Sequence, residues 1–513
     1  MQLQRAFWPY VAVVLGLMMA LQIISVRGEA QTVDEAVYLA AGVTYWTTGD
    51  YRMNPEHPPL EKLISALPLL PLHLDLRTGT KLWSNVIGPG LDEYYYAQDF
   101  LYNNRVPWQT ILFLARLPTI VLTAVFGLIL ALWTLRRAGA WAGIIAVTLF
   151  AFDPTLLAHG RYVTNDLWIG FFVFVACIAW DAAVSRKTAL PYFAIAGLAL
   201  GCAFGTKASA IALPIIFLGI AIARRAAWKS VVPRTALTVV IALGVLALLY
   251  RGSLGAYATG FLFQYHQFQA PHLLAYLFGQ KSESGWWYYY PAVFAIKTPL
   301  AELTLTLVAV VVLTRKKKVP GNLAVLIVPI VTFAIVSLFA HIDIGIRYLL
   351  PIYPMLFAFI GIVACSLRPH WPIAACLGFL AVESLTSFPN YLPFANIAFG
   401  GPDQTTRYVL DSNADWGQAA PQLKTWLDAR GISKICFAYF GAEPRSALGF
   451  TYVDVPPNPT GDPRNVNCLV AASAQYLFLH DDLAWLRALQ PVVKVGHAIY
   501  VYDLRHGTGA GGR

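Results

Sequence analysis

Apolar and polar stretches alternate along residues 1–388 in the pattern of a polytopic α-helical membrane protein. A transmembrane helix needs about 20 mainly apolar residues. The first run, Phe7 to Val26, has about this length, and no small-residue cleavage site follows it, so we interpret it as a retained membrane helix. Further apolar runs bring the expected number of spans to about eleven. These runs cover residues 111–134, 140–152, 166–184, 190–205, 208–223, 235–251, 298–314, 323–340, 348–366 and 371–388.

The basic residues between these runs indicate how the chain crosses the membrane. Short cytoplasmic loops carry an excess of Lys and Arg. Clusters around Arg136, Arg224 and Arg368 all fall on the side of the N-terminus, which is therefore expected in the cytoplasm. The opposite, extracytoplasmic face then receives a large first loop, residues 27–108, and the whole of residues 389–513.

The C-terminal part, residues 389–513, has more charge and shorter apolar runs than the preceding part. A helix-like stretch, DWGQAAPQLKTWLDARG, is followed by the strand-like stretches KICFAYF, CLVAA, VVKVG and AIYVYDL. This order predicts a small extracytoplasmic α/β domain after a membrane module of residues 1–388. Cys436 and Cys468 fall in this domain, and an oxidising compartment would allow a disulfide if their Cβ atoms are close.

The composition agrees with a membrane protein. Of 513 residues, 58% are hydrophobic and only 12% are charged, against about 25% charged in soluble proteins. The net charge of +10 is explained by the basic loops between the apolar runs. We therefore expect no nucleic-acid partner. No usable N-glycosylation site occurs, since Asn458 is followed by Pro459. This favours a bacterial cytoplasmic (inner) membrane.

Two polar clusters follow the first apolar helix. Asp34 and Glu35 come first, and the sequence Glu-His-Pro-Pro from Glu56 follows about twenty residues later. A carboxylate outside a membrane helix is commonly a solvated cap. A second carboxylate, Asp166, begins a later span at the same face, and two carboxylates at headgroup depth suit proton transfer from a hydroxyl. Their spacing alone leaves both interpretations open.

Five ordered motifs resemble a known family. They are DEAVY, NPEHPPLEK, HGRYVTND, SGWWYYYPAVFAIKTPL and HIDIGIRYLLPIYP. Together they are similar to the GT-C glycosyltransferases of the protein O-mannosyltransferase and aminoarabinose transferase type, which take a sugar from a polyprenyl-phosphate carrier. The resemblance covers residues 5–385, and the tail sequence RYVLDSNADWGQ is similar to the C-terminal domains of bacterial members.

The resemblance implies roles for particular residues. Asp34 corresponds to the family's presumed general base, with Glu35 beside it, and Asp166 corresponds to its second-loop aspartate. Arg347 and Tyr348 correspond to its Arg-Tyr-x-x-Pro segment. The implied fold is a GT-C helical module with a large first extracytoplasmic loop.

One position departs from part of the family. His57 stands where the aminoarabinose transferases have a lysine, although the mannosyltransferases also have histidine there, so the phosphate-binding role of that lysine is not transferred. His57 could bind donor phosphate, hold a divalent metal ion together with Glu56, or do neither. No other cofactor is expected.

The chemistry also asks for cations. A sugar leaving a lipid phosphate builds negative charge on that phosphate, so the site needs positive groups near it. Arg347 and Lys297 are the outer-face cations that we favour, although each could instead snorkel to the membrane interface. Lys207 is a third candidate, with anchoring as its alternative role.

These observations predict a membrane glycosyltransferase. It would move a hexose or pentose from a polyprenyl-phosphate carrier to an acceptor hydroxyl on a protein, lipid or glycan, with inversion and with Asp34 as the base. The alternative is a lipid or solute transporter or flippase without covalent chemistry. The sequence contains no evident internal repeat, and its polar residues collect at one membrane surface, which favours an enzyme.

Overall fold

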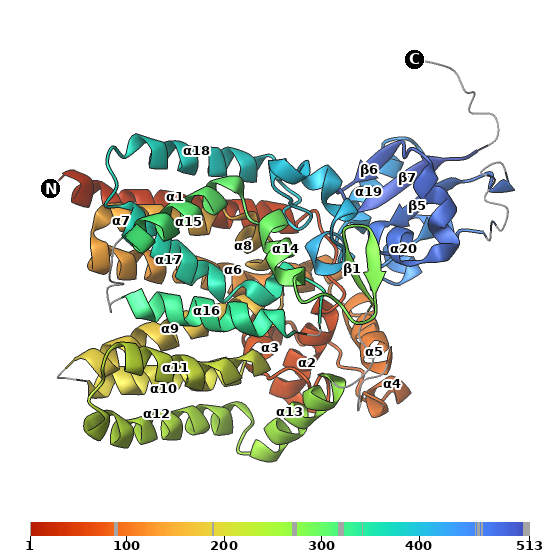
Figure 1. The fold of residues 1–513 in the computed structure, drawn as a ribbon. Helices are drawn as coiled ribbons and strands as arrows, with labels where there is room; N and C mark the ends of the chain where they lie inside the picture. Colours follow the sequence, from red (N-terminus) through yellow and green to blue (C-terminus); the bar gives the residue numbers. More distant parts are fainter. Residues whose placement is uncertain are drawn as a thin grey trace.

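The protein is described by a computed structural model that covers residues 2–86, 91–186, 189–268, 274–315, 323–340, 342–456, 458, 462 and 465–505. Long helices lie side by side, and the N-terminus is at one end of this bundle (Figure 1). A smaller domain with a β-sheet lies at the opposite end (Figure 1). A mainly helical polytopic fold with a small C-terminal sheet domain is therefore confirmed.

Four single helices of the described chain are long and apolar enough to cross a membrane. A further apolar pair passes the same test together, but its two helices are bent by 115° at Thr298 and Pro299. The four helices are α1 (Gln2–Val26), α6 (Trp108–Ala138), α9 (Asn165–Ser185) and α12 (Trp228–Leu249), and the bent pair is α14 (Tyr289–Lys297) with α15 (Leu300–Arg315).

Six shorter apolar segments of 10–17 residues complete the bundle. A 15-residue helix is only about 22 Å long, less than the roughly 30 Å of a bilayer's hydrocarbon core. Each apolar segment coincides with an expected span, but the number of eleven spans stays a prediction. The six are α7 (Ala140–Phe152), α10 (Leu190–Phe204), η2 with α11 (Ala208–Ala212 and Leu213–Ala223), α16 (Ala324–Leu338), α17 (Ile352–Ala364) and α18 (Trp371–Leu385).

The basic turns that the sequence assigned to one side lie at one end of the bundle. The turns between α6 and α7, α11 and α12, and α17 and α18 are all at the end that holds the N-terminus (Figure 1). Asp181 is buried near the end of α9 and forms ion pairs with Arg137 at 2.5 Å and with Arg224 at 2.6 Å. One buried carboxylate thus ties together two of the basic turns.

The first loop folds into a helical unit with its own core. Gly42 allows its first two helices to pack closely, because a Cβ there would lie 2.2 Å from the carbonyl oxygen of Lys62. Tyr45, Tyr96 and Phe100 are almost fully buried in this core. The unit contains α2 (Glu35–Thr48), α3 (Leu60–Ala66), η1 (Leu67–Leu72), α4 (Lys81–Ser84) and α5 (Leu91–Tyr102).

The C-terminal domain contains a five-stranded mixed sheet in the order β4-β3-β5-β7-β6. The pairs β3–β4 and β3–β5 are parallel, while β5–β7 and β6–β7 are antiparallel. Cys436 and Cys468 form a disulfide with a Cα separation of 6.1 Å. The elements are α19 (Ala420–Asp428), β3 (Lys434–Ala438), η8 (Arg445–Ala447), β4 (Thr451–Val453), β5 (Leu469–Ser473), α20 (Ala474–Leu479), η10 (Asp481–Ala488), β6 (Val493–Val495) and β7 (Ile499–Asp503).

Two connecting regions complete the end of the bundle beside the sheet domain. One contains helix α13 (Leu254–Phe268) and a hairpin of β1 (Ala275–Leu277) and β2 (Gln280–Ser282). The other joins α18 to α19 through η5 (Ile397–Phe399), η6 (Pro402–Arg407) and η7 (Asp411–Asn413). Val409 forms an isolated bridge with Leu277 of β1. The regions before and after the bent pair of helices therefore meet here.

Candidate active site

Four charged side chains from separate segments meet near the first loop; we call them the ion cluster. Asp34 precedes α2, and Asp166 lies in the first turn of α9. Lys207 immediately precedes η2, and Arg347 belongs to the short helix η4 (Ile346–Leu349). The structure therefore brings together residues that are up to 313 positions apart in the chain.

The distances within the ion cluster are unequal. Lys207 Nζ lies 2.5 Å from Asp166 Oδ1. Arg347 Nη1 lies 3.3 Å from Asp34 Oδ2 and 3.6 Å from Asp166 Oδ2. Asp166 is thus tightly bound to one cation, whereas Arg347 sits loosely between two carboxylates.

Asp34 is the open member of the ion cluster. Its side chain is 25% exposed, compared with 10% for Arg347 and 0% for Asp166. Burial of the carboxyl group raises the pKa of Asp34, and the nearby Arg347 guanidinium opposes this shift. Asp34 is therefore a carboxylate of increased basicity that still reaches solvent, as a general base requires.

Aromatic rings hold the two cations from the side. Lys207 Nζ lies 4.2 Å from the centre of the Tyr348 ring. The Arg347 guanidinium lies 5.5 Å from the same ring and 4.3 Å from the Trp416 ring. These distances permit cation–π attraction. Tyr348, which the sequence placed at the site, therefore contacts both cations.

Glu35 is next to Asp34 but faces a different set of groups. Its Oε2 accepts the Thr32 backbone N–H at 2.8 Å and Arg116 Nη2 at 2.6 Å. Its Oε1 accepts Arg116 Nε at 2.8 Å and the Val163 N–H at 2.9 Å. Both oxygens are engaged in a fully buried network. This geometry gives Glu35 a structural role, and its predicted catalytic role gains no support.

The Glu56 and His57 pair forms a neighbouring wall. Glu56 accepts Asn54 Nδ2 at 2.5 Å, and the His57 ring stacks on Tyr38 with 5.6 Å between centroids. Lys62 Nζ donates to the carbonyl oxygens of Asn54 and His57 at 2.8 and 2.6 Å. Burial and the positive charge of Lys62 place the pKa of His57 well below its ordinary value. His57 is therefore neutral at pH 7.

The Glu56 and His57 pair was also expected to be a candidate metal site. Among the described residues, no group of three or more His, Cys, Asp or Glu side chains is arranged to hold a metal ion. Glu56 and His57 supply two candidate ligands, fewer than the three protein ligands of a catalytic zinc site. The binding of a metal ion by Glu56 and His57 therefore stays a prediction.

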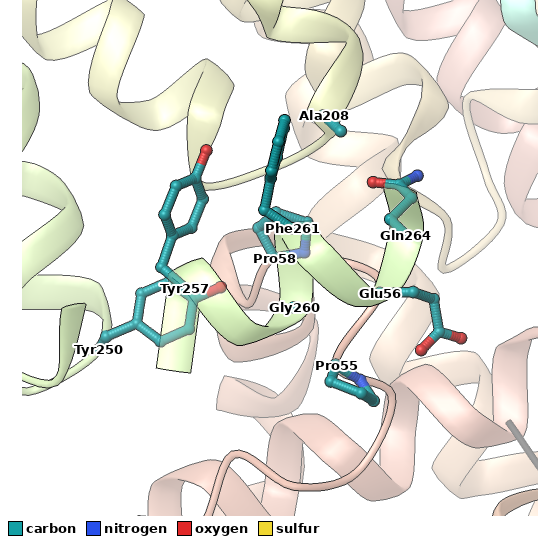
Figure 2. A pocket seen from close by; sticks show the side chains of 9 residues that line it. All are labelled: Pro55, Glu56, Pro58, Ala208, Tyr250, Tyr257, Gly260, Phe261 and Gln264. Carbon is teal, nitrogen blue, oxygen red and sulfur yellow. The ribbon is translucent and has the colours of Figure 1, made fainter. Parts of the chain in front are cut away.

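A small pocket borders this wall on the side of α13. It lies between the Pro55–Pro58 turn and the α13 helix, next to Ala208, whose chain neighbour is Lys207 (Figure 2). Gly260 brings the helix close, because a Cβ there would lie 2.2 Å from the carbonyl oxygen of Pro55. The lining residues are Pro55, Glu56, Pro58, Ala208, Tyr250, Tyr257, Gly260, Phe261 and Gln264.

Lys297 lies outside the ion cluster. Its buried ammonium donates to the carbonyl oxygens of Leu392 and Asn413 at 2.7 and 2.6 Å. It therefore holds the connection between α18 and α19 against the bent pair of helices. This is a structural contact, and the expected binding of donor phosphate by Lys297 stays untested.

Sequence reasoning missed the contribution of residues 409–418 to the site. This segment brings Trp416 onto the Arg347 guanidinium. The sequence predicted that this region belonged to a separate outer domain. Its available signal was the stretch RYVLDSNADWGQ, which resembles the tails of related proteins but carries no catalytic motif.

One protein family matches the N-terminal part of the chain. Residues 11–255 match the family described as dolichyl-phosphate-mannose-protein mannosyltransferase. The matched region contains three members of the ion cluster, Asp34, Asp166 and Lys207. A search of curated protein sequences finds no match.

Solved structures share the fold over nearly the whole chain. ArnT from Cupriavidus metallidurans bound to undecaprenyl phosphate has a TM-score of 0.52 and 14% identity, covering 97% of this chain and 98% of its own. The apo state of the same protein gives a TM-score of 0.53 and 13% identity with the same coverage. The likeness shows a common fold.

The fold is thus that of a polytopic membrane protein similar to known glycosyltransferases. Just under half of the chain is similar to a family of protein mannosyltransferases, and nearly the whole chain shares the fold of ArnT. The resemblance inferred from the five motifs is confirmed.

Proposed function

We propose that the enzyme transfers a sugar from a polyprenyl-phosphate carrier to an acceptor hydroxyl, with inversion, at the outer face of a bacterial cytoplasmic membrane. The observation that carries this proposal is the partly exposed Asp34 beside the mostly buried Arg347, which shares Asp166 with a second buried cation, Lys207. The ArnT structure with undecaprenyl phosphate supports a polyprenyl carrier.

The cations receive the leaving group. The donor phosphate lies between Lys207 and Arg347, and the bond between the anomeric carbon and the phosphate oxygen breaks with its electron pair remaining on oxygen. The two cations stabilise the charge that develops there. Asp166, 2.5 Å from Lys207 and 3.6 Å from Arg347, keeps both in place.

Asp34 activates the acceptor. Its carboxylate takes the proton of the acceptor hydroxyl while that oxygen bonds to the anomeric carbon from the face opposite the phosphate. The products are the glycoside and polyprenyl phosphate, and Asp34 later releases its proton to solvent. Because the donor phosphate competes with Asp34 for Arg347, donor binding weakens the contact that lowers the pKa of Asp34. Donor binding thus makes Asp34 a stronger base.

The test is sugar transfer by the purified full-length protein in detergent. Radiolabelled polyprenyl-phosphate hexoses and pentoses are supplied with an envelope extract as acceptor, and labelled product and released polyprenyl phosphate are measured. Asp34→Asn removes the base and should lower turnover by about 10²- to 10⁴-fold. A covalent product from the wild-type protein also excludes transport as its sole activity.

A matched substitution controls for charge loss in the same loop. Asp50 pairs with Arg52 at 2.6 Å and lies outside the ion cluster, so Asp50→Asn should retain wild-type turnover. Near-normal transfer by a folded Asp34→Asn protein would refute the assignment of the base.

A further inference from the structure

We propose that Trp416 is a positioning residue that holds the Arg347 guanidinium in place beside Asp34 and Asp166. The inference rests on the proposed function, because it assigns Arg347 to the donor phosphate and Asp34 to the acceptor proton. It gives the region after the membrane module a part in the active site, beyond that of a separate outer domain.

The contact itself is close and buried. The Arg347 guanidinium lies 4.3 Å from the centre of the Trp416 ring, and Trp416 is only 2% exposed. The rings of His159 and Tyr162 each lie 6.1 Å from the Trp416 ring, and Tyr162 meets it edge-on. The indole is therefore packed in one position and presents a fixed surface to Arg347.

Backbone contacts link the 409–418 segment to the segment that carries Asp34. The Val33 N–H donates to the Trp416 carbonyl oxygen at 3.1 Å. The Ala30 N–H donates to the Gln418 carbonyl oxygen at 3.0 Å. The residue immediately before Asp34 is thus bonded to Trp416 itself.

The same segment is also bonded to the residues before Arg347. The Ile346 N–H donates to Asn413 Oδ1 at 2.9 Å, and Ser412 Oγ donates to the Ile344 carbonyl oxygen at 2.8 Å. Residues 409–418 therefore connect the chain segments of the proposed base and the proposed phosphate ligand, which are otherwise joined by a single 3.3 Å contact.

The C-terminal domain holds this segment from the other side. The Gln475 backbone N–H donates to Asp415 Oδ2 at 3.0 Å, and the Asp411 N–H donates to Gln475 Oε1 at 2.9 Å. Gln475 belongs to α20, directly after strand β5. The sheet domain is thus connected to Arg347 through Asp415 and Trp416.

The physical role follows from the flexibility of arginine. The long Arg347 side chain makes only loose contacts with its two carboxylates, so these do not fix the plane of the guanidinium. Stacking on an indole does fix that plane. A displacement of about 1 Å in a substrate-positioning group can cost about 100-fold in rate.

The experiment compares Trp416→Leu, which keeps an apolar side chain without a π face, with Trp416→Phe, which keeps the face. Transfer is measured with the same polyprenyl-phosphate sugars across a range of pH. We expect Trp416→Leu to lower kcat/KM by about 10- to 100-fold and Trp416→Phe to stay within about three-fold of wild type. The acid limb of the pH profile should move to higher pH in Trp416→Leu, because a displaced Arg347 no longer lowers the pKa of Asp34.

The matched control is Trp426→Leu. Trp426 of α19 lies 4.1 Å from the Arg430 guanidinium and packs against the core of the C-terminal domain, so its loss should leave kcat/KM and the acid limb unchanged. If Trp416→Leu does not fold, Trp416→Met is measured in the same way. An unmoved acid limb, or equal losses in the Phe and Leu variants, would overturn the positioning role. The proposed function fails separately, through full turnover by Asp34→Asn.

Discussion

Asp34 and Glu35 are adjacent in the sequence, yet their surroundings differ sharply. Glu35 is buried and accepts four hydrogen bonds, two of them from Arg116. Asp34 is partly exposed and accepts a single 3.3 Å hydrogen bond from Arg347. Their two arginine partners differ in the same way, since Arg116 also donates to the Ala30 carbonyl oxygen at 2.7 Å while Arg347 Nε has no hydrogen-bond partner among the described residues.

This difference distinguishes a carboxylate that stabilises the fold from one that can take part in proton transfer. A carboxylate whose lone pairs are all occupied cannot accept a further proton without breaking the fold around it. A carboxylate with free lone pairs and one loose partner can accept a proton at little structural cost. The contrast supports the proposal that Asp34 is the base, and it gives Glu35 the structural role of joining the first loop to the membrane helices.

The largest effect is expected when the charge of the structural residue Glu35 is removed. Glu35→Gln leaves Arg116 buried without its counterion, and removing one partner of a buried ion pair costs about 3–5 kcal/mol. We expect a large drop in the apparent melting temperature of the purified protein in detergent, followed by tryptophan fluorescence. Asp34→Asn should melt near the wild-type temperature.

An exposed ion pair provides the control for Glu35→Gln. Asp454 pairs with Arg445 at 2.7 Å, and both side chains are mostly exposed, so Asp454→Asn should leave the melting temperature unchanged. If Glu35→Gln has the same melting temperature as Asp454→Asn but a lower turnover, Glu35 has a catalytic role and the structural role given to it here is wrong.

The next largest effect is expected on the pH dependence of the rate, which tests Asp34 as the proposed base. A general base works when deprotonated, so the rate falls as the pH drops through its pKa. Burial raises the pKa of Asp34 above the ordinary value of about 3.9, and the acid limb of kcat/KM should lie correspondingly higher. Arg347→Gln removes the largest opposing charge and should move the limb further up, whereas Arg347→Lys should move it less. An acid limb near the ordinary value would contradict Asp34 as a buried base.

The sequence predicted the fold class and named all four members of the ion cluster as candidates, with Lys207 as the third-ranked cation. Continuous hydrophobic runs of 13 to 24 residues give a strong signal, so each predicted span coincides with an apolar helical segment. Asp34, Asp166 and Arg347 were found because they lie within motifs and at one predicted membrane surface. The predicted strands agree with β3, β5, β6 and β7.

Roles that depend on distant partners were not predictable. Glu35 looked like a companion to Asp34 because its partner Arg116 is 81 positions away within an apolar helix. Lys297 looked like a free outer cation, but its carbonyl partners lie 95 and 116 positions later. No local pattern encodes such contacts. The 115° bend at Thr298 and Pro299 is likewise visible only in the folded chain.

The smallest effect is expected at the contact between helix α13 and the Pro55–Pro58 turn, next to the Glu56 and His57 pair. In Gly260→Ala the added Cβ would lie 2.2 Å from the Pro55 carbonyl oxygen, so the helix or the turn must shift, at a cost of about 1–3 kcal/mol. Glu56 and His57 lie in that turn. We expect a several-fold higher KM for the donor with little change in kcat, measured by initial-rate kinetics in detergent.

Helix α13 supplies its own control for this substitution. A Cβ at Gly255 would meet nothing within 4 Å, so Gly255→Ala makes the same chemical change on the same helix without a clash. If both variants raise the KM equally, the effect comes from the helix itself and not from the turn. If only Gly260→Ala raises the KM, the turn that carries Glu56 and His57 contributes to donor binding. This turn then resembles Asp34, which has few contacts, and differs from Glu35, whose two oxygens are fully hydrogen-bonded.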